Sequence, residues 1–125
     1  MKPSWLFVEN GLRALAGGLN IEIRLPWYRG LPLSIIEIVG ARINGKSIGR
    51  NELTFSVNGK PRPAQDLEGL YLENWYLLDS AYLHVPYVWA KQGDEYDVGV
   101  TLVLHPPYIP GVPFQSSFDR RMRAN

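Results

Sequence analysis

Glycine and proline interrupt this chain so often that they decide which folds it can adopt. The 125 residues contain 12 Gly and 10 Pro, spread at short intervals along the sequence. Proline removes a backbone donor and breaks a helix interior, whereas glycine permits the positive φ angles of tight turns. We therefore expect an all-β chain of short strands joined by turns. Its length accommodates one domain with one hydrophobic core.

Alternating apolar and polar residues indicate where the strands lie. Residues 95–104 are the clearest example, because every second side chain from Tyr96 to Leu104 is apolar. A set of six or seven such strands is typical of an antiparallel β-sandwich or a small open barrel. The segments predicted as strands are 21–25, 34–43, 46–48, 53–57, 81–85 and 95–104.

Two Asn-Gly pairs predict tight hairpins, at Asn44-Gly45 and at Asn58-Gly59, because both residues tolerate positive φ. Residues 61–79 keep no single period, so we expect a long loop with one helical turn. The prolines of residues 106–110 cannot donate ladder hydrogen bonds and should end the sheet. The β-sandwich domain is accordingly assigned to residues 1–110. Residues 111–125 are expected to form a C-terminal tail that is ordered only against a partner.

Composition excludes several classes of function. With 13 basic and 12 acidic side chains the formal net charge is +1, which gives no positive field for holding nucleic acid. The chain has no cysteine, so disulfides, thiolate nucleophiles and Cys-ligated metals are excluded, and a reducing cytoplasm fits this count. No apolar run reaches the length of a membrane span, and no signal peptide is recognisable. We expect a cytoplasmic protein without a nucleic-acid or membrane partner.

The sequence contains no recognisable set of catalytic groups. His84 and His105 lie near the ends of different predicted strands without a third ligand nearby in sequence, so no metal site is expected. The acidic cluster at residues 94–97 follows a turn, where solvated charge is the usual role. An independent enzyme is the weaker class of function, and we assign no catalytic residue to this chain.

One segment has the composition of a binding surface. Residues 24–34, RLPWYRGLPLS, hold two arginines, two aromatics and two prolines. Trp, Tyr and Arg are enriched at binding hot spots, although the aromatics of such a crossover can equally cap a core. Trp75 and Trp89 are further aromatics that could stack on a sugar or an aglycone. The candidate residues for an interface or a substrate mouth are Arg24, Trp27, Tyr28, Arg29 and Pro32.

With these residues the sequence resembles a known family, the small or beta subunit of bacterial C-glycoside deglycosidases. The likeness covers roughly residues 5 to 110, and segment 24–34 is its distinctive part, whereas the hairpin segments are generic β sequence. The stretches that carry it are residues 24–34, 43–45, 53–59, 83–86 and 96–108.

The resemblance implies a β-sandwich that binds a larger alpha subunit with a sugar-isomerase-like barrel. That partner would hold a divalent metal, commonly manganese, and the active-site histidines and carboxylates. The complex would cleave, by elimination, the carbon-carbon bond between a 3-oxo sugar and an aromatic aglycone of flavonoid or anthraquinone type. A metal that polarises the ketone would stabilise the enolate. Tyr28 and Arg29 are the best candidates to approach substrate, because a phenol and a planar guanidinium can meet a carbonyl or a phenolic aglycone.

Two other functions remain open from the sequence. A free-standing carbohydrate-binding β-sandwich would bind sugar through Trp75, Trp89 or Trp27 without a partner. An isolated metal-dependent enzyme would use His84 and His105 and would purify with stoichiometric metal.

Overall fold

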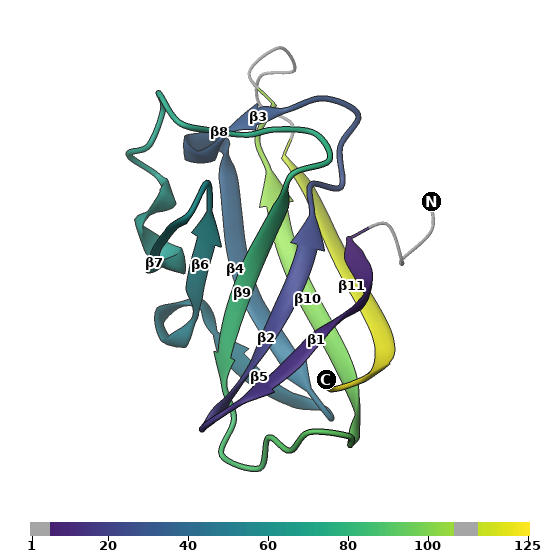
Figure 1. The fold of residues 1–125 in the computed structure, drawn as a ribbon. Coiled ribbons are helices and arrows are strands. Elements are labelled where there is room, and N and C mark those ends of the chain that lie inside the picture. The colour runs from purple at the N-terminus through teal and green to yellow at the C-terminus, as the bar shows by residue number, and fades with distance from the viewer. Residues whose placement is uncertain (1–5, 107–112) are drawn as a thin grey trace.

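Two antiparallel sheets stacked face to face form a β-sandwich in the computed structural model, which describes residues 6–106 and 113–125 (Figure 1). Five strands in the order β1, β2, β9, β6, β7 make one sheet, and four in the order β11, β10, β4, β5 make the other. Neither sheet closes into a barrel, so of the two expected architectures the sandwich is confirmed. The first sheet comprises β1 (Phe7–Leu15), β2 (Gly18–Arg24), β9 (Ser80–Pro86), β6 (Thr54–Val57) and β7 (Lys60–Pro63). The second comprises β11 (Phe114–Arg123), β10 (Glu95–Leu104), β4 (Ile36–Ile43) and β5 (Lys46–Gly49).

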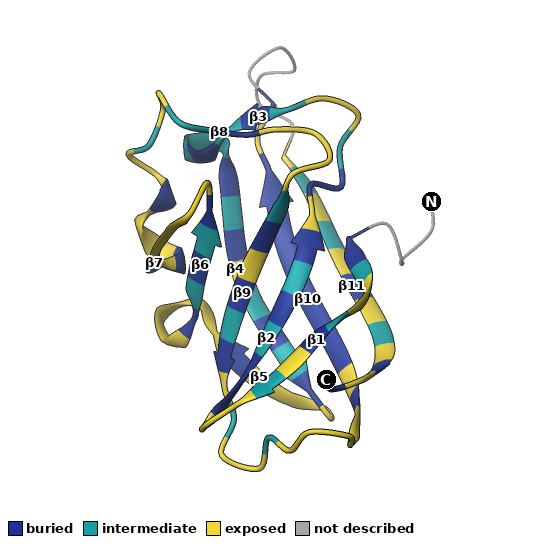
Figure 2. Cartoon of the chain, in the orientation of Figure 1, coloured by how far each residue is buried: buried dark blue, intermediate teal, exposed yellow. Residues whose placement is uncertain are grey.

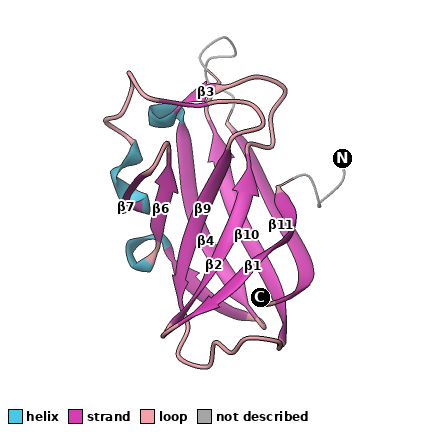
Figure 3. Ribbon diagram, in the orientation of Figure 1, coloured by secondary structure: helices cyan, strands magenta, loops and turns pink. Residues whose placement is uncertain are grey.

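Smaller elements cover one end and one side of the sandwich (Figure 3). The two-stranded ribbon of β3 (Leu31–Pro32) and β8 (Asn74–Trp75) lies at the end where β2 and β10 finish (Figure 1). Within residues 6–106 and 113–125, the 3-10 turns are η2 (Leu33–Ile35), η3 (Arg50–Glu52) and η4 (Ala64–Leu67). Within the described ranges, no helical segment has the length and apolar character needed to cross a membrane.

The core lies between the two sheets and is built by the alternation seen in the sequence. On β10 the side chains predicted to share the inner face, from Tyr96 to Leu104, are buried, and from Val98 onward the residues between them are buried as well (Figure 2). Strands β2 and β9 bury their alternate apolar residues against the same core. Among the largest fully enclosed side chains are Trp75 and Phe55. At about 25 cal/mol per Å² of apolar surface, this burial is the main favourable term in folding.

Both predicted hairpins are present, with the backbone geometry that the Asn-Gly pairs favour. Asn44 and Gly45 have φ of 50° and 83°, and they connect β4 to β5. Asn58 and Gly59 have φ of 57° and 73°, and they connect β6 to β7. Positive φ at both central residues matches the right-handed twist of the flanking strands, so these turns also fix the register of each hairpin.

Strand β1 was not expected from the sequence, because a bulge hides its pattern. Phe7 pairs with Ile23 and Leu12 with Ile21, so six residues of β1 span three of β2. Asn10, within the bulge, has a φ of 58°. A bulge breaks the alternation of inward and outward side chains, which is the signal used to recognise a strand.

The expected C-terminal tail is instead a sheet strand, which corrects the predicted domain boundary at residue 110. Strand β11 pairs with β10 along its whole length, from Phe114 opposite Leu104 to Arg123 opposite Glu95. Phe118 and Met122 enter the core. Most of the proline run at residues 106–110 lies outside the described residues.

The expected loop at residues 61–79 holds the predicted helical turn, as η4, but also most of β7 and all of β8. These strands were missed because β7 contains two prolines and β8 has only two residues, so neither carries a readable alternation.

Candidate functional site

The predicted contact segment forms part of one end of the sandwich. Arg24 is the last residue of β2, and its N–H donates to the carbonyl of Leu6 over 2.8 Å. Leu25 and Pro26 are buried and fix the root of the loop. Beyond them the side chains of Tyr28, at 64% exposure, and Arg29 face outward. The segment thus combines a fixed base with an exposed tip, which suits a contact surface.

Aromatic contacts set the conformation of this loop. The half-buried ring of Trp27 lies 5.3 Å from the ring of Phe114 on β11 and 5.3 Å from that of Tyr28. The guanidinium carbon of Arg29 lies 5.5 Å from the centroid of the Tyr28 ring, a cation–π distance. Trp27 therefore packs on the sandwich, whereas Tyr28 and Arg29 are held at the surface.

The β3–β8 ribbon brings a second segment against this loop. Leu31 pairs with Trp75 and Pro32 with Asn74. At Gly30 an added Cβ would lie 3.2 Å from the Trp75 carbonyl oxygen, so glycine permits the close approach of the two segments. The predicted residues of 24–32 are thereby joined to residues 70–79, a segment whose role could not be read from the sequence.

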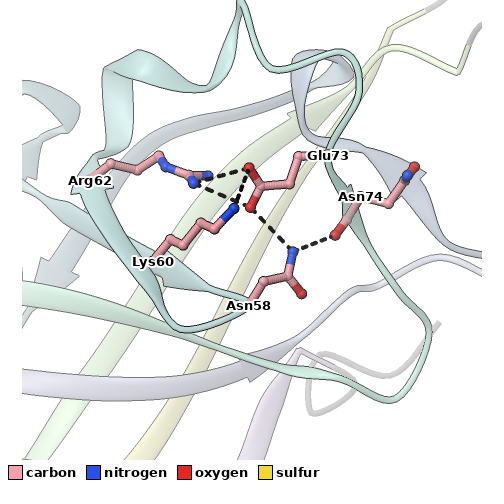
Figure 4. Close-up of polar contacts among 5 residues, drawn as sticks. All are labelled: Asn58, Lys60, Arg62, Glu73 and Asn74. Atoms are coloured by element: carbon pink, nitrogen blue, oxygen red, sulfur yellow. Dashed lines mark hydrogen bonds and ion pairs between the residues drawn. The ribbon is translucent and has the colours of Figure 1, made fainter.

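A cluster of polar contacts around Glu73 anchors that second segment (Figure 4). The Nη2 of Arg62 donates to both carboxylate oxygens of Glu73, at 3.1 and 3.2 Å, and the Nζ of Lys60 lies 3.9 Å from Oε1. The Nδ2 of Asn58 donates to the carbonyl of Asn74 over 2.9 Å and lies 3.4 Å from the Glu73 carboxylate. The β6–β7 hairpin therefore holds the side chain of Glu73 and the backbone carbonyl of Asn74.

This environment changes the acidity of Glu73. Partial burial raises the pKa of its carboxyl, but hydrogen bonds from Asn58 and Arg62 and the positive charges of Arg62 and Lys60 outweigh that effect. The net result is a pKa of Glu73 below its ordinary value. The carboxylate stays ionised at neutral pH, so the anchor is intact there.

Trp75 cannot serve as a stacking platform, which corrects the prediction for this residue. Its side chain has 0% exposure, and its ring centroid lies 5.5 Å from that of Phe55. Its Nε1 donates to the carbonyl of Asp79 over 2.9 Å. Trp75 is a core residue that also ties down the turn at residues 76–79.

Comparison with known proteins decides the family. The family model described as C-glycoside deglycosidase beta subunit matches residues 7–108, which is most of the chain. The chain belongs to the C-glycoside deglycosidase beta subunit family. The match confirms the resemblance inferred from segment 24–34 and the strands that follow it.

Individual relatives agree with this family. A C-glycoside deglycosidase beta subunit from Arthrobacter globiformis is 31% identical over 111 residues, covering 88% of this chain and 84% of the relative. A 3'-dehydrocarminate deglycosidase beta subunit from Microbacterium sp. is 31% identical over 105 residues, covering 84% and 79%. A C-glycoside deglycosidase beta subunit from Microbacterium trichothecenolyticum is 33% identical over 109 residues, covering 87% and 82%. The name beta subunit implies a heteromeric complex with another subunit.

In this member of the C-glycoside deglycosidase beta subunit family, several exposed apolar side chains lie at the same end of the sandwich as the predicted loop. They were missed because an aromatic-rich segment without a period gives no sign of which side chains point outward. The segments directly before and after β8 lie at the same end of the sandwich as the loop (Figure 1). The exposed large apolar residues of these segments and the loop are Tyr28, Tyr71, Leu72, Tyr76, Leu77 and Leu78. We call these six side chains the apolar end.

Trp89 lies at the opposite end of this beta-subunit family member, in the loop between β9 and β10 (Figure 1). Its ring is 64% exposed, it makes an edge contact with Tyr87, and the Nζ of Lys46 lies 5.2 Å from its centroid. The structure thus separates Trp89 from the other predicted site residues.

The two histidines are not brought together. His84 belongs to β9 in the five-stranded sheet, whereas His105 follows β10 in the four-stranded sheet. The Nε2 of His105 and the Nη1 of Arg50 each lie 3.4 Å from the Glu37 carboxylate, in an open hollow of about 440 Å³. Within residues 6–106 and 113–125, no three His, Asp or Glu side chains are grouped so as to hold a metal ion.

Proposed function

We propose that this chain acts as the beta subunit of a complex that cleaves the C–C bond between a 3-oxo sugar and an aromatic aglycone. The observation that carries the proposal is the family match over residues 7–108. The Microbacterium relative, a 3'-dehydrocarminate deglycosidase beta subunit by name, supports a substrate with an oxidised sugar. The aglycone would be of flavonoid or anthraquinone type.

The reaction is an elimination whose catalytic groups we place in the larger subunit. A base removes the C2 proton, which the neighbouring 3-oxo group acidifies, and the resulting enolate expels the aglycone from C1. The C1–C electron pair leaves with the aglycone, which takes up a proton. A divalent metal in the partner, manganese in this proposal, would supply Lewis-acid stabilisation of the enolate oxygen.

For this chain the proposed role is to bind the larger subunit and to border its active site. Tyr28 and Arg29 are exposed on a loop whose root is buried, so they can contact a partner with little loss of conformational entropy. We assign Arg24, Trp27 and Pro32 to the same surface. None of these residues is given a catalytic role.

Reconstitution tests the proposed function. The chain is affinity-purified from its own host, the co-eluting proteins are identified by mass spectrometry, and the larger subunit is then produced separately. Release of aglycone from a 3-oxo-C-glycoside is followed by chromatography. We expect release only when both subunits are present. A chain that elutes alone from its host and adds nothing to any partner's activity would contradict the proposal.

Arg29→Ala tests the loop directly. Because truncation of an interface hot spot typically costs about 2 kcal/mol or more, we expect affinity for the larger subunit to fall about 30-fold. Isothermal titration calorimetry measures this, and urea unfolding should be unchanged because Arg29 is exposed. The matched control is Arg123→Ala. Arg123 is an exposed arginine at the last position of β11, whereas the loop contacts the first residue of that strand, so this variant should bind like the unaltered chain.

A second candidate function, a free-standing carbohydrate-binding module, is favoured by the exposed ring of Trp89 alone. Quenching of tryptophan emission by sugars, measured on the chain without a partner, distinguishes it. Quenching that Trp89→Ala abolishes would support this module, and no quenching would leave the subunit as the function.

A further inference from the structure

Leu78 combines two features that are unfavourable in an isolated domain. Its φ is 72°, in the left-handed region where a residue with a Cβ is strained, and its side chain is 72% exposed. It is the third residue of a turn in which the Asp79 N–H donates to the Tyr76 carbonyl over 3.1 Å, a position that favours Gly or Asn when φ is positive. Strain that presents an apolar side chain to solvent indicates a functional position.

The surrounding segment is held firmly even though its apolar side chains are outside. Besides the Glu73 anchor, the Leu33 N–H donates to the Glu73 carbonyl over 2.8 Å, and Trp75 holds Asp79 through its Nε1. Leu72, directly before the anchored Glu73, is 85% exposed. The backbone is therefore held at Glu73, Asn74, Tyr76 and Asp79, whereas the side chains of Leu72, Tyr76, Leu77 and Leu78 stay exposed.

The geometry points to the apolar end as the surface on which the larger subunit docks. This inference rests on the proposed function and adds to it the place of contact. The apolar end continues the loop of Tyr28 and Arg29, because Gly30 and the β3–β8 ribbon join the two segments. Docking there would bury the leucines and tyrosines that the free chain exposes.

The exposed apolar area of the apolar end is large enough for a protein–protein interface. With ~150–250 Å² for a whole aromatic side chain, the tyrosines at 64, 70 and 57% exposure present about 300–500 Å². The three leucines of the apolar end add to that figure. A standard interface takes about 800 Å² from each partner, so the apolar end would supply most of one side.

The opposite end of the sandwich is a weaker candidate. Its exposed large apolar side chains include Leu15, Val88 and Trp89, fewer than at the apolar end, and the Trp89 ring already carries Lys46 at cation–π distance. Val88, at 77% exposure, therefore provides a matched control for Leu72.

The test compares full-length variants in binding to the separately produced larger subunit. Leu72→Asp introduces a charge into the proposed interface and should weaken binding at least about 30-fold, the effect of losing one hot spot. Leu78→Gly removes a contact side chain and relieves the left-handed strain, so it keeps the test valid if Leu72→Asp folds poorly. Val88→Asp should bind like the unaltered chain. Calorimetry gives the affinities, and circular dichroism checks the fold of each variant.

The outcomes separate the two proposals. If the unaltered chain does not bind the larger subunit, the proposed function is wrong and the docking surface with it. If the unaltered chain binds and the variants at Leu72 and Leu78 bind equally well, only the docking surface is wrong. Weakening by Val88→Asp alone would place the contact at the opposite end. Native mass spectrometry tests whether the chain forms a dimer through this surface. If Leu72→Asp dissociates such a dimer and leaves the affinity for the larger subunit unchanged, the surface binds a second copy of the chain and the inference is wrong.

Discussion

Leu78 provides a measurable link between local strain and stability. A left-handed conformation costs a residue with a Cβ about 1–2 kcal/mol, whereas the greater freedom of glycine in the unfolded chain costs about 0.5–1 kcal/mol. We therefore expect Leu78→Gly to raise the free energy of unfolding by about 0.5–1 kcal/mol, measured with urea. Leu77→Gly, at a neighbouring position without positive φ, should instead lower it by about 0.4–1 kcal/mol. Equal effects at both positions would argue against strain at Leu78.

Glu73 makes stability depend on pH in a defined direction. Its pKa in the folded chain lies below the ordinary value of 4.5, so its stabilising contribution is present above that value. As pH falls below about 4.5 and through the lowered pKa, the contribution is lost. Urea midpoints of the chain and of Glu73→Gln should differ at neutral pH and converge in acid. Curves that stay parallel throughout would contradict the anchor.

The sequence indicates which residue types could form a contact surface, but it does not indicate which of those side chains are exposed. Tyr28 and Arg29 lie at the surface, whereas Trp75, assigned the same kind of role as Trp89, is fully buried. Burial of Trp75 depends on its pairing with Leu31 and its packing on Phe55, which are distant in sequence. Contacts between residues distant in sequence cannot be inferred from a segment that shows no regular spacing of apolar residues.

At the scale of the element, a substitution in β11 can test whether residues 114–123 form a strand of the sheet or a loose tail. Phe118 is buried opposite Val100, so Phe118→Ala should lower the free energy of unfolding by about 3–5 kcal/mol. The exposed Gln115 on the same strand is the control, and Gln115→Ala should change stability by less than about 0.5 kcal/mol. Urea unfolding measures both. An unaffected Phe118→Ala chain would mean that residues 114–123 add nothing to the core.

Strands with a regular alternation of apolar and polar residues could be predicted from the sequence, whereas strands in which that alternation is interrupted could not. Strand β10 and the two Asn-Gly hairpins lie where alternation and turn chemistry put them. Strand β1 contains a bulge, and β11 is mostly polar, with Phe118 and Met122 as its buried side chains. Such strands exist because neighbouring strands pair with them, a tertiary effect that overrides their own pattern.

For the whole molecule, binding of the larger subunit should stabilise this chain. A ligand that binds only the folded state at 100 times its dissociation constant adds about 2.7 kcal/mol, which for a domain of this size raises Tm by about 10 °C. Limited proteolysis along a temperature ramp, scored by mass spectrometry, follows this chain separately from its partner. An equal concentration of serum albumin is the control. A Tm that does not depend on the larger subunit would contradict a stable complex.

The four outer strands of the two sheets suggest how this chain avoids polymerising. Strand β7 contains Pro61 and Pro63, β1 is bulged at Asn10, β5 has four residues, and β11 carries Arg121 and Arg123. Prolines, bulges, short length and charge are the devices that keep sheet edges from recruiting strands of other molecules. Fibre-like growth by strand addition is therefore disfavoured on every side, and the sandwich is left free to assemble end-on.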